Sequence, residues 1–170
     1  MQGAGLAADS HTILALLTAQ AKAQDCKLSD ITAVLGLMAE NSIKRNTFIC
    51  TGVINALRNC RSLNVRDRMH LGMKEYTCMK SAHITVTSET INSVICLLFE
   101  CDEADRALEM LDEMSSCGIT PTAHTYTLLI MIAVDQGYLD KANELEELKA
   151  TMTYLMGRPS ENSQSGRPMW

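Results

Sequence analysis

Cysteine and histidine are the residue types here most able to bind a metal ion or attack a substrate, and the chain has seven and four of them. No two cysteines form a CxxC pair, and none stands with a histidine at the spacing of a zinc site. We therefore expect no metal site, no cofactor and no catalytic residue, and reduced, largely buried thiols. The cysteines are Cys26, Cys50, Cys60, Cys78, Cys96, Cys101 and Cys117.

One stretch, Asp102–Asp105, reads DEAD, which is a helicase signature. Helicase chemistry needs a GxxxxGKS/T loop to hold phosphates, and this sequence contains none. The four histidines are scattered without a shared local setting. We interpret the match as coincidental and expect a protein that is not an enzyme.

The segment Cys101–Ala142 has the pattern of alternating helices and turns. Apolar residues recur at spacings of three and four after Asp102, which stands where a helix N-cap belongs. Gly118 can end this helix with a positive φ, and Pro121 prevents helix directly before it. Helices and turns at such short spacing indicate a repeat array.

The helical pattern repeats with a period of 35 residues. Gly72, Ala107 and Ala142 are small residues spaced 35 apart, and we expect each to lie where the second helix of a repeat crosses close to the first. Met38 and Met79 are 41 apart, which indicates six additional residues in the second repeat. The predicted repeats are 12–46, 47–87, 88–122 and 123–157.

The six additional residues are placed most simply at Arg61–Arg68, between helices expected at Phe48–Asn59 and Met69–Met79. This segment is expected to be an enlarged turn outside the stack. Because longer surface loops add little entropic cost, we expect that deleting six residues there leaves a folded protein.

Three stretches resemble the pentatricopeptide repeat family. Residues 121–130, PTAHTYTLLI, are similar to the opening of that repeat, and Gly137–Ala142, GYLDKA, to its midpoint. Leu108–Met114 with Gly118–Pro121 is similar to its close. The resemblance implies an all-α fold, a right-handed α-solenoid of stacked helix-turn-helix repeats whose first helices line a groove. The tetratricopeptide class, with a period of about 34 residues, is the alternative architecture.

The predicted domain of four hairpins leaves a short segment at each end. Residues 1–11 form an N-terminal extension without the basic region and apolar core of a signal peptide, so no targeting segment is visible. Residues 158–170 are polar, contain Gly-Arg-Pro, and are expected to be a disordered tail. No stretch approaches the roughly 18 apolar residues of a membrane span, so we expect no membrane partner.

Charge changes sign along the predicted array. Repeat one carries four basic and three acidic residues, and repeat two carries six and two, giving +1 and +4. Repeat three carries one and eight, and repeat four carries two and five, giving −7 and −3. Only repeat two has the basic footprint typical of nucleic-acid binding. The predicted first helices carry few charges, so attraction to phosphates is expected to be weak.

The family resemblance implies binding of single-stranded RNA, with one base read per repeat by the fifth and last residues. In repeat one the fifth residue is Leu16, which cannot hydrogen-bond a base. Asn at the fifth place is expected to favour a pyrimidine and Thr a purine, while Phe48 or Ile91 stacks on bases. The candidate RNA-binding residues are Thr51 with Thr87, Asn92 with Thr122, Thr127, and Arg58 as a phosphate contact.

A protein-interaction scaffold is the alternative function. The net charge of −5 and the small number of repeats fit a subunit of an organellar RNA or ribosomal complex that does not read bases. The expected partners are therefore single-stranded RNA, protein components of an RNA complex, or both, and no small-molecule substrate. The resemblance further implies a mitochondrial or plastid location.

Overall fold

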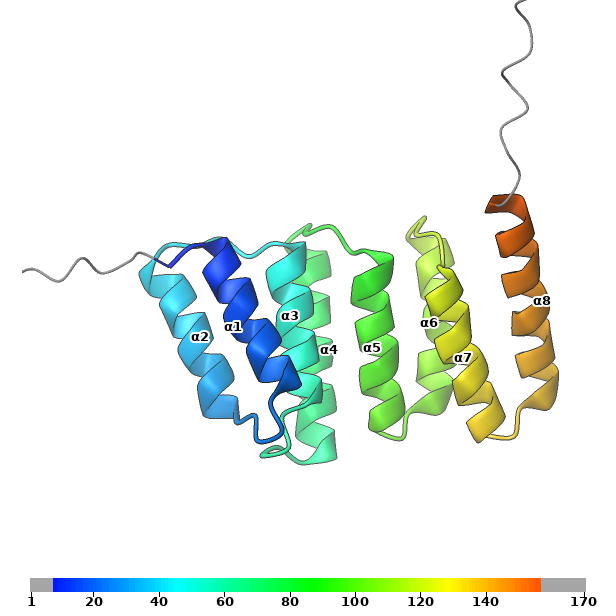
Figure 1. The fold of residues 1–170 in the computed structure, drawn as a ribbon, viewed down its shortest axis with the longest axis horizontal. Coiled ribbons are helices and arrows are strands. Elements are labelled where there is room, and N and C mark those ends of the chain that lie inside the picture. The colour runs from blue at the N-terminus through cyan, green and yellow to red at the C-terminus, as the bar shows by residue number, and fades with distance from the viewer. Residues whose placement is uncertain (1–7, 157–170) are drawn as a thin grey trace, which may run out of the picture.

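The computed structural model describes residues 8–156, which fold into eight α-helices joined by short turns (Figure 1). This part of the chain contains no strand, so the all-α helical repeat fold is confirmed. The predicted tail and residues 1–7 lie outside the described residues. The helices are α1 (Ser10–Lys22), α2 (Leu28–Glu40), α3 (Thr47–Arg58), α4 (Val65–Ser81), α5 (Ser88–Glu100), α6 (Ala104–Ser116), α7 (Ala123–Asp135) and α8 (Leu139–Met156).

Successive helices pair into four hairpins, and the hairpins stack side by side. The first helices α1, α3, α5 and α7 each pack on the one before, forming one layer of the stack. Each second helix packs on the first helix of its own hairpin and, in α2, α4 and α6, on that of the next. No second helix packs directly on another second helix, so the two layers are not equivalent. Among residues 8–156, no helix has the length and apolar character needed to cross a bilayer.

The core consists mainly of aliphatic side chains, methionine and cysteine, with Tyr76 and Tyr126 as its buried aromatic residues. It forms two clusters that divide along α3. Cys50 and Ile54 pack with repeats three and four, whereas Val53 and Leu57 pack with repeat one. Each hairpin therefore buries its apolar face against its neighbours instead of around one common centre.

Each first helix begins with a side chain that caps the backbone. Asp9 and Asn46 accept hydrogen bonds from backbone N–H groups three residues on, at 2.8 and 3.0 Å. Thr87 and Thr122 do the same at 3.3 and 3.2 Å. Because α1 begins at Ser10, the first repeat starts two residues before its predicted start.

The six additional residues of repeat two do not form the predicted enlarged turn at Arg61–Arg68. The turn ends at Asn64, and α4 has 17 residues where α6 has 13, so much of the additional length extends the helix. Ser62 accepts a hydrogen bond from the backbone N–H of Leu28 at 3.2 Å. Arg68 donates to the carbonyl of Arg58 at 2.8 Å. The segment is therefore part of the packed structure.

The sequence also predicts a role for three other positions, and the structure confirms the first and changes the other two. Gly118 has a φ of 66°, which confirms its predicted role in ending α6. Asp102 is not an N-cap, because it adopts a φ of 62° and Glu103 occupies the cap position without a side-chain bond. At Gly72 a Cβ would overlap Leu97, so the small residue admits the first helix of the next repeat, not of its own.

Candidate nucleic-acid interface

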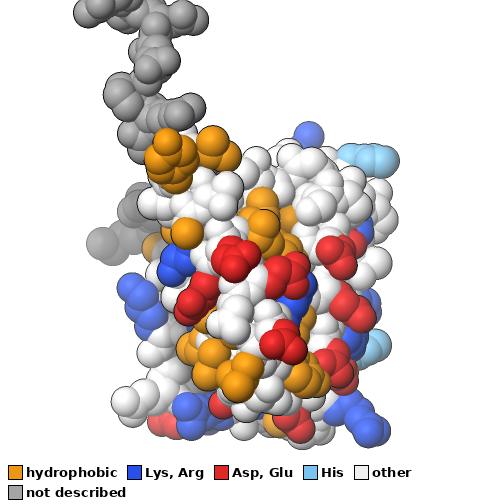
Figure 2. All heavy atoms as spheres, turned by 90° about the vertical axis from the view of Figure 1, so that its right-hand side faces the viewer, with side chains coloured by type: hydrophobic (Ala, Val, Ile, Leu, Met, Phe, Trp, Pro, Cys, Tyr) orange, Lys and Arg blue, Asp and Glu red, His pale blue; other side chains and the backbone are white. Residues whose placement is uncertain are grey.

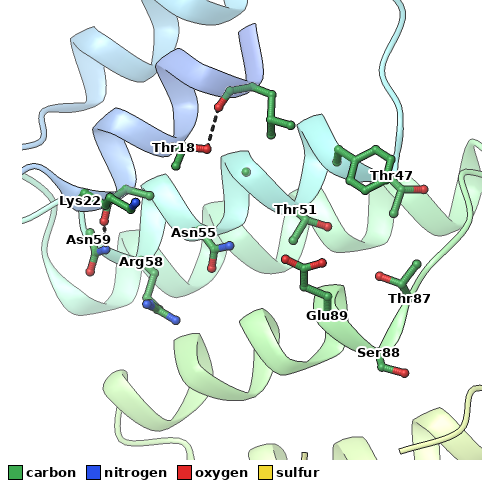
Figure 3. Close-up of a pocket in the computed structure, with 14 residues that line it drawn as sticks. Thr18, Lys22, Thr47, Thr51, Asn55, Arg58, Asn59, Thr87, Ser88 and Glu89 are labelled. Atoms are coloured by element: carbon green, nitrogen blue, oxygen red, sulfur yellow. Dashed lines mark hydrogen bonds between the residues drawn. The ribbon is translucent and has the colours of Figure 1, made fainter. Parts of the chain in front are cut away.

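A groove of roughly 660 Å³ crosses the layer of first helices. Its walls come from α1, from one face of α3 and from the start of α5 (Figure 3). Thr51, Asn55 and Arg58 follow one another along α3 at spacings of four and three, which places them on the same side of the helix. Thr51, Thr87 and Arg58 are thus brought together as predicted residues of one surface.

The groove contains both signs of charge. Arg58 lies with its Nε 3.3 Å from Glu100 Oε1, so a carboxylate from α5 partly neutralises it. Lys22, on the neighbouring helix α1, is a second cation that lines the groove (Figure 3). Glu89 stands at the opposite side, on the first turn of α5. Attraction for a phosphate chain is therefore present but modest.

The predicted last-position residues are helix caps. Thr87 Oγ1 accepts from the backbone N–H of Thr90, and the Thr90 hydroxyl accepts from the backbone N–H of Thr87. Thr122 and Thr125 repeat the arrangement at α7. These hydroxyls are occupied with the backbone, which leaves them less able to read a base.

Two of the predicted fifth-position residues are engaged within the protein. Thr51 is 6% exposed, and its Oγ1 lies 2.8 Å from the hydroxyl of Thr90 on the next first helix. Thr127 is exposed, but its hydroxyl donates to the carbonyl of Ala123 and accepts from Lys149 Nζ, both at 2.8 Å. Both hydroxyls would have to exchange a partner to bind RNA.

Asn92 is the predicted reader with a free hydrogen-bonding atom. It lies five residues after the cap Thr87, in register with Thr51 after the cap Asn46. Its side chain is 9% exposed, and its Oδ1 is buried without a hydrogen-bond partner among the described residues. Asn92 does not line the groove described above. A buried acceptor left unpaired costs about 1–3 kcal/mol, and a donor that reaches it removes this cost.

Stacking on bases is possible for only one of the two predicted side chains. Phe48 is 65% exposed and lines the groove. Ile91 is 0% exposed and belongs to the core, so its prediction as a stacking residue is wrong. Adjacent positions of a helix point in different directions, and Ile91 lies on the face of α5 that points into the core.

Sequence reasoning overlooked two features of this surface. Asn55 lines the groove, and its spacing of four from Thr51 on a predicted helix could have indicated it. Lys149 reaches Thr127 from α8, at the position where repeats two and three bury Met79 and Met114. The 35-residue register shows that lysine replaces methionine at this position. Only the structure shows that Lys149 contacts Thr127.

Most of the thiols are buried as expected of structural cysteines, but two are not: Cys26, Cys50, Cys60 and Cys101 are buried, Cys96 is partly buried, and Cys78 and Cys117 are exposed. Burial raises the pKa of Cys50 to about 12 and that of Cys26 to about 11, which keeps both protonated and unreactive at neutral pH. Within residues 8–156, no three histidine, cysteine or acidic side chains gather in a way that could hold a metal ion.

Hairpins stacked in one direction, with a groove along their first helices, define an α-solenoid built from helical repeats. Residues 86–132 match the PPR repeat family, the pentatricopeptide repeat. The fold is similar to the crystal structure of the PPR domain of Arabidopsis thaliana protein-only RNase P 1 in complex with tRNA, with a TM-score of 0.66 and 17% identity. The match covers 94% of this chain and 79% of that chain. The family match therefore covers the third repeat and the start of the fourth, and the fold of the stack is that of a solved PPR domain. None of the curated proteins matches its sequence.

Proposed function

We propose that this protein binds single-stranded RNA along its first helices and acts without catalysis in organellar RNA processing, stability or translation. Its place would be a mitochondrion or a plastid. Three features support this role: the groove across α1, α3 and α5, the match of residues 86–132 to the PPR repeat family, and the fold shared with a domain solved in complex with tRNA.

Asn92 carries the proposal. Its Oδ1 is the one buried side-chain acceptor among the described residues without a hydrogen-bond partner. Bases of a single strand expose N–H donors on their edges, and such a donor would satisfy this atom. With the hydroxyls of Thr51 and Thr127 engaged, repeat three supplies most of the base discrimination.

Affinity is expected to be low, micromolar or poorer, or about −8 kcal/mol at best. Lys22 and Arg58 are the cations of the groove, and Glu100 offsets the second of them. Each phosphate contact lowers the slope of log affinity against log salt by about 0.7 for a single strand. We therefore expect a shallow salt dependence that becomes shallower in Lys22→Ala.

The test is a titration with two short unstructured RNAs that differ only in the middle base. We expect the RNA with a pyrimidine there to bind more tightly than the one with a purine, and Asn92→Ala to abolish the difference. Asn143→Ala is the matched control, because Asn143 is exposed on α8, away from the groove. Equal affinity of the native chain for both RNAs would exclude base reading.

A protein-interaction scaffold within an RNA complex is the second candidate. The end of the stack formed by α8 favours it, because acidic side chains lie over this face with hydrophobic ones between them (Figure 2). Leu139, Tyr154 and Leu155 are each more than 60% exposed there. An acidic surface of this kind repels RNA and suits a basic protein partner.

A further inference from the structure

The layer of second helices contains clefts, because these helices do not pack on one another. Between α4 and α6 side chains bridge the cleft. Tyr76 donates a hydrogen bond from its hydroxyl to Glu113 Oε1 at 3.1 Å. Lys80 forms an ion pair with the same carboxylate, and its ammonium lies 5.6 Å from the centre of the Tyr76 ring.

The corresponding cleft between α2 and α4 has no such bridge. The repeat register places Leu35 where α4 has Tyr76, Ala39 where it has Lys80, and Cys78 where α6 has Glu113. Leucine, alanine and cysteine are shorter or apolar, and they cannot form the hydrogen bond or the ion pair. An open cleft of about 400 Å³ lies between these two helices.

The walls of this cleft are almost entirely apolar. Leu28, Ile31 and Leu35 line it from α2, and Leu71 and Met79 line it from α4. The floor is formed by α3, which lies beneath both helices. A trough between two helices over a helical floor is the shape that receives the apolar stripe of an amphipathic helix.

The rim of the cleft carries a small net positive charge. Lys74 and Arg45 stand at its edge, and Arg45 is ion-paired with Glu75, which is only 8% exposed. The buried carboxylate is thereby neutralised, while Lys74 adds a positive charge in the repeat whose net charge is +4. Acidic groups beside an incoming apolar stripe would therefore be attracted.

We infer that the α2/α4 cleft, defined by the residues above, binds an acidic amphipathic helix of a protein partner. Apolar side chains at i, i+3 or i+4, and i+7 enter between Ile31, Leu35 and Leu71. Glutamate or aspartate side chains on the flank of that helix face Lys74, because the charge of Arg45 is already paired with Glu75. RNA does not fit the same surface, because the apolar walls offer no donors to phosphates or base edges. This site lies on second helices and is separate from the proposed RNA groove.

The test uses a fluorescent synthetic helix with leucines on one stripe and glutamates on its flanks, and the full-length protein. A triple variant, Leu35→Tyr, Ala39→Lys and Cys78→Glu, copies the α4/α6 bridge into the α2/α4 cleft. We expect the native chain to bind this peptide and the variant to bind it at least about tenfold more weakly. Circular dichroism and the melting temperature establish that the variant is folded, and Lys74→Glu weakens binding without filling the cleft.

Two control peptides sharpen the result. One carries lysines in place of the glutamates, and the other has the same composition with the leucines moved off the stripe. Weak binding of both controls supports the inference. Failure of the acidic peptide to bind the native chain at about 100 μM, equal binding of the lysine peptide, or unchanged binding by both Lys74→Glu and the filled variant would overturn it. RNA titration is a separate readout, because none of these substitutions lies in the groove of first helices.

Discussion

Gly36 and Gly72 both lie in second helices but occupy opposite environments. We therefore expect their replacement by alanine to change stability in opposite directions. At Gly72 a Cβ would overlap Leu97, which is fully buried, whereas at Gly36 it would meet no atom within 4 Å. Gly72→Ala forces buried side chains to move, and we expect a net loss of about 1–2 kcal/mol. Gly36→Ala removes backbone freedom from the unfolded chain and is expected to stabilise by about 1 kcal/mol. Urea unfolding of both variants measures this, and equal effects would contradict the placement of Gly72.

The bridge between Lys80 and Glu113 predicts a pH-dependent contribution to stability. The Lys80 ammonium, assisted by the Tyr76 hydroxyl, lowers the pKa of Glu113 below its ordinary value of 4.5. Its stabilisation is therefore fully present above that value and is lost as the pH falls through the lower, folded pKa. Because Lys80 is 45% exposed, Lys80→Met is expected to lower stability at neutral pH by at most about 1 kcal/mol.

The difference between native and Lys80→Met chains should shrink as the pH falls below 4.5 and disappear once the pH is well below the lowered pKa of Glu113. Lys141→Met is the control, since Lys141 pairs with Glu144 between exposed side chains and should change little at any pH. A deficit of Lys80→Met that persists at low pH would mean that Lys80 acts through its aliphatic carbons instead of its charge.

At the scale of single residues, three of the six candidate RNA-binding residues line the groove, namely Thr51, Thr87 and Arg58. Thr51 and Arg58 lie on the surface that the repeat register assigns to them. The engagement of Thr51 by Thr90 joins residues 39 apart in sequence, and the pairing of Arg58 with Glu100 joins two helices. These contacts depend on how neighbouring hairpins are rotated relative to one another. The sequence of a single repeat does not determine that rotation.

At the scale of elements, the caps of the first helices predict how substitution at Thr122 acts. Thr122→Ala removes the acceptor for the Thr125 backbone N–H and is expected to cost about 1 kcal/mol. Thr122→Asp keeps an acceptor at the cap, and its melting temperature should stay close to that of the native chain. A melting temperature unaffected by Thr122→Ala would show that the bond adds nothing to the start of α7.

Between α6 and α7 the helix boundaries have local signals in the sequence, because Gly118 follows the end of α6 and Pro121 precedes the start of α7. In repeat two the residues from Val65 to Arg68 are all compatible with helix, and no breaker separates them from Met69. Sequence therefore revealed the six additional residues but could not show that they lengthen α4.

At the scale of the whole molecule, the divided core predicts unequal protection from hydrogen exchange. The helix α5 contacts α3, α4, α6 and α7, whereas α2 contacts only α1 and α3. In a stacked array, local unfolding requires the least free energy in the helices that contact the fewest neighbours. We expect amides of α5 to exchange at least tenfold more slowly than those of α2, measured by mass spectrometry. Identical rates in the two helices would indicate one cooperative unit.

The direct packing of first helices also fixes the distance between successive repeats along any RNA strand that binds across them. Packed helices lie about 8–10 Å apart, whereas consecutive bases in a stacked strand rise by about 3.4 Å. An RNA that meets one hairpin per nucleotide must therefore separate its bases from one another before it binds. Base stacking then acts as a competitor of the protein. RNA strands whose bases stack poorly would reorganise less on binding than purine-rich strands. Warming loosens base stacking, so it would reduce the difference in affinity between the two kinds of strand.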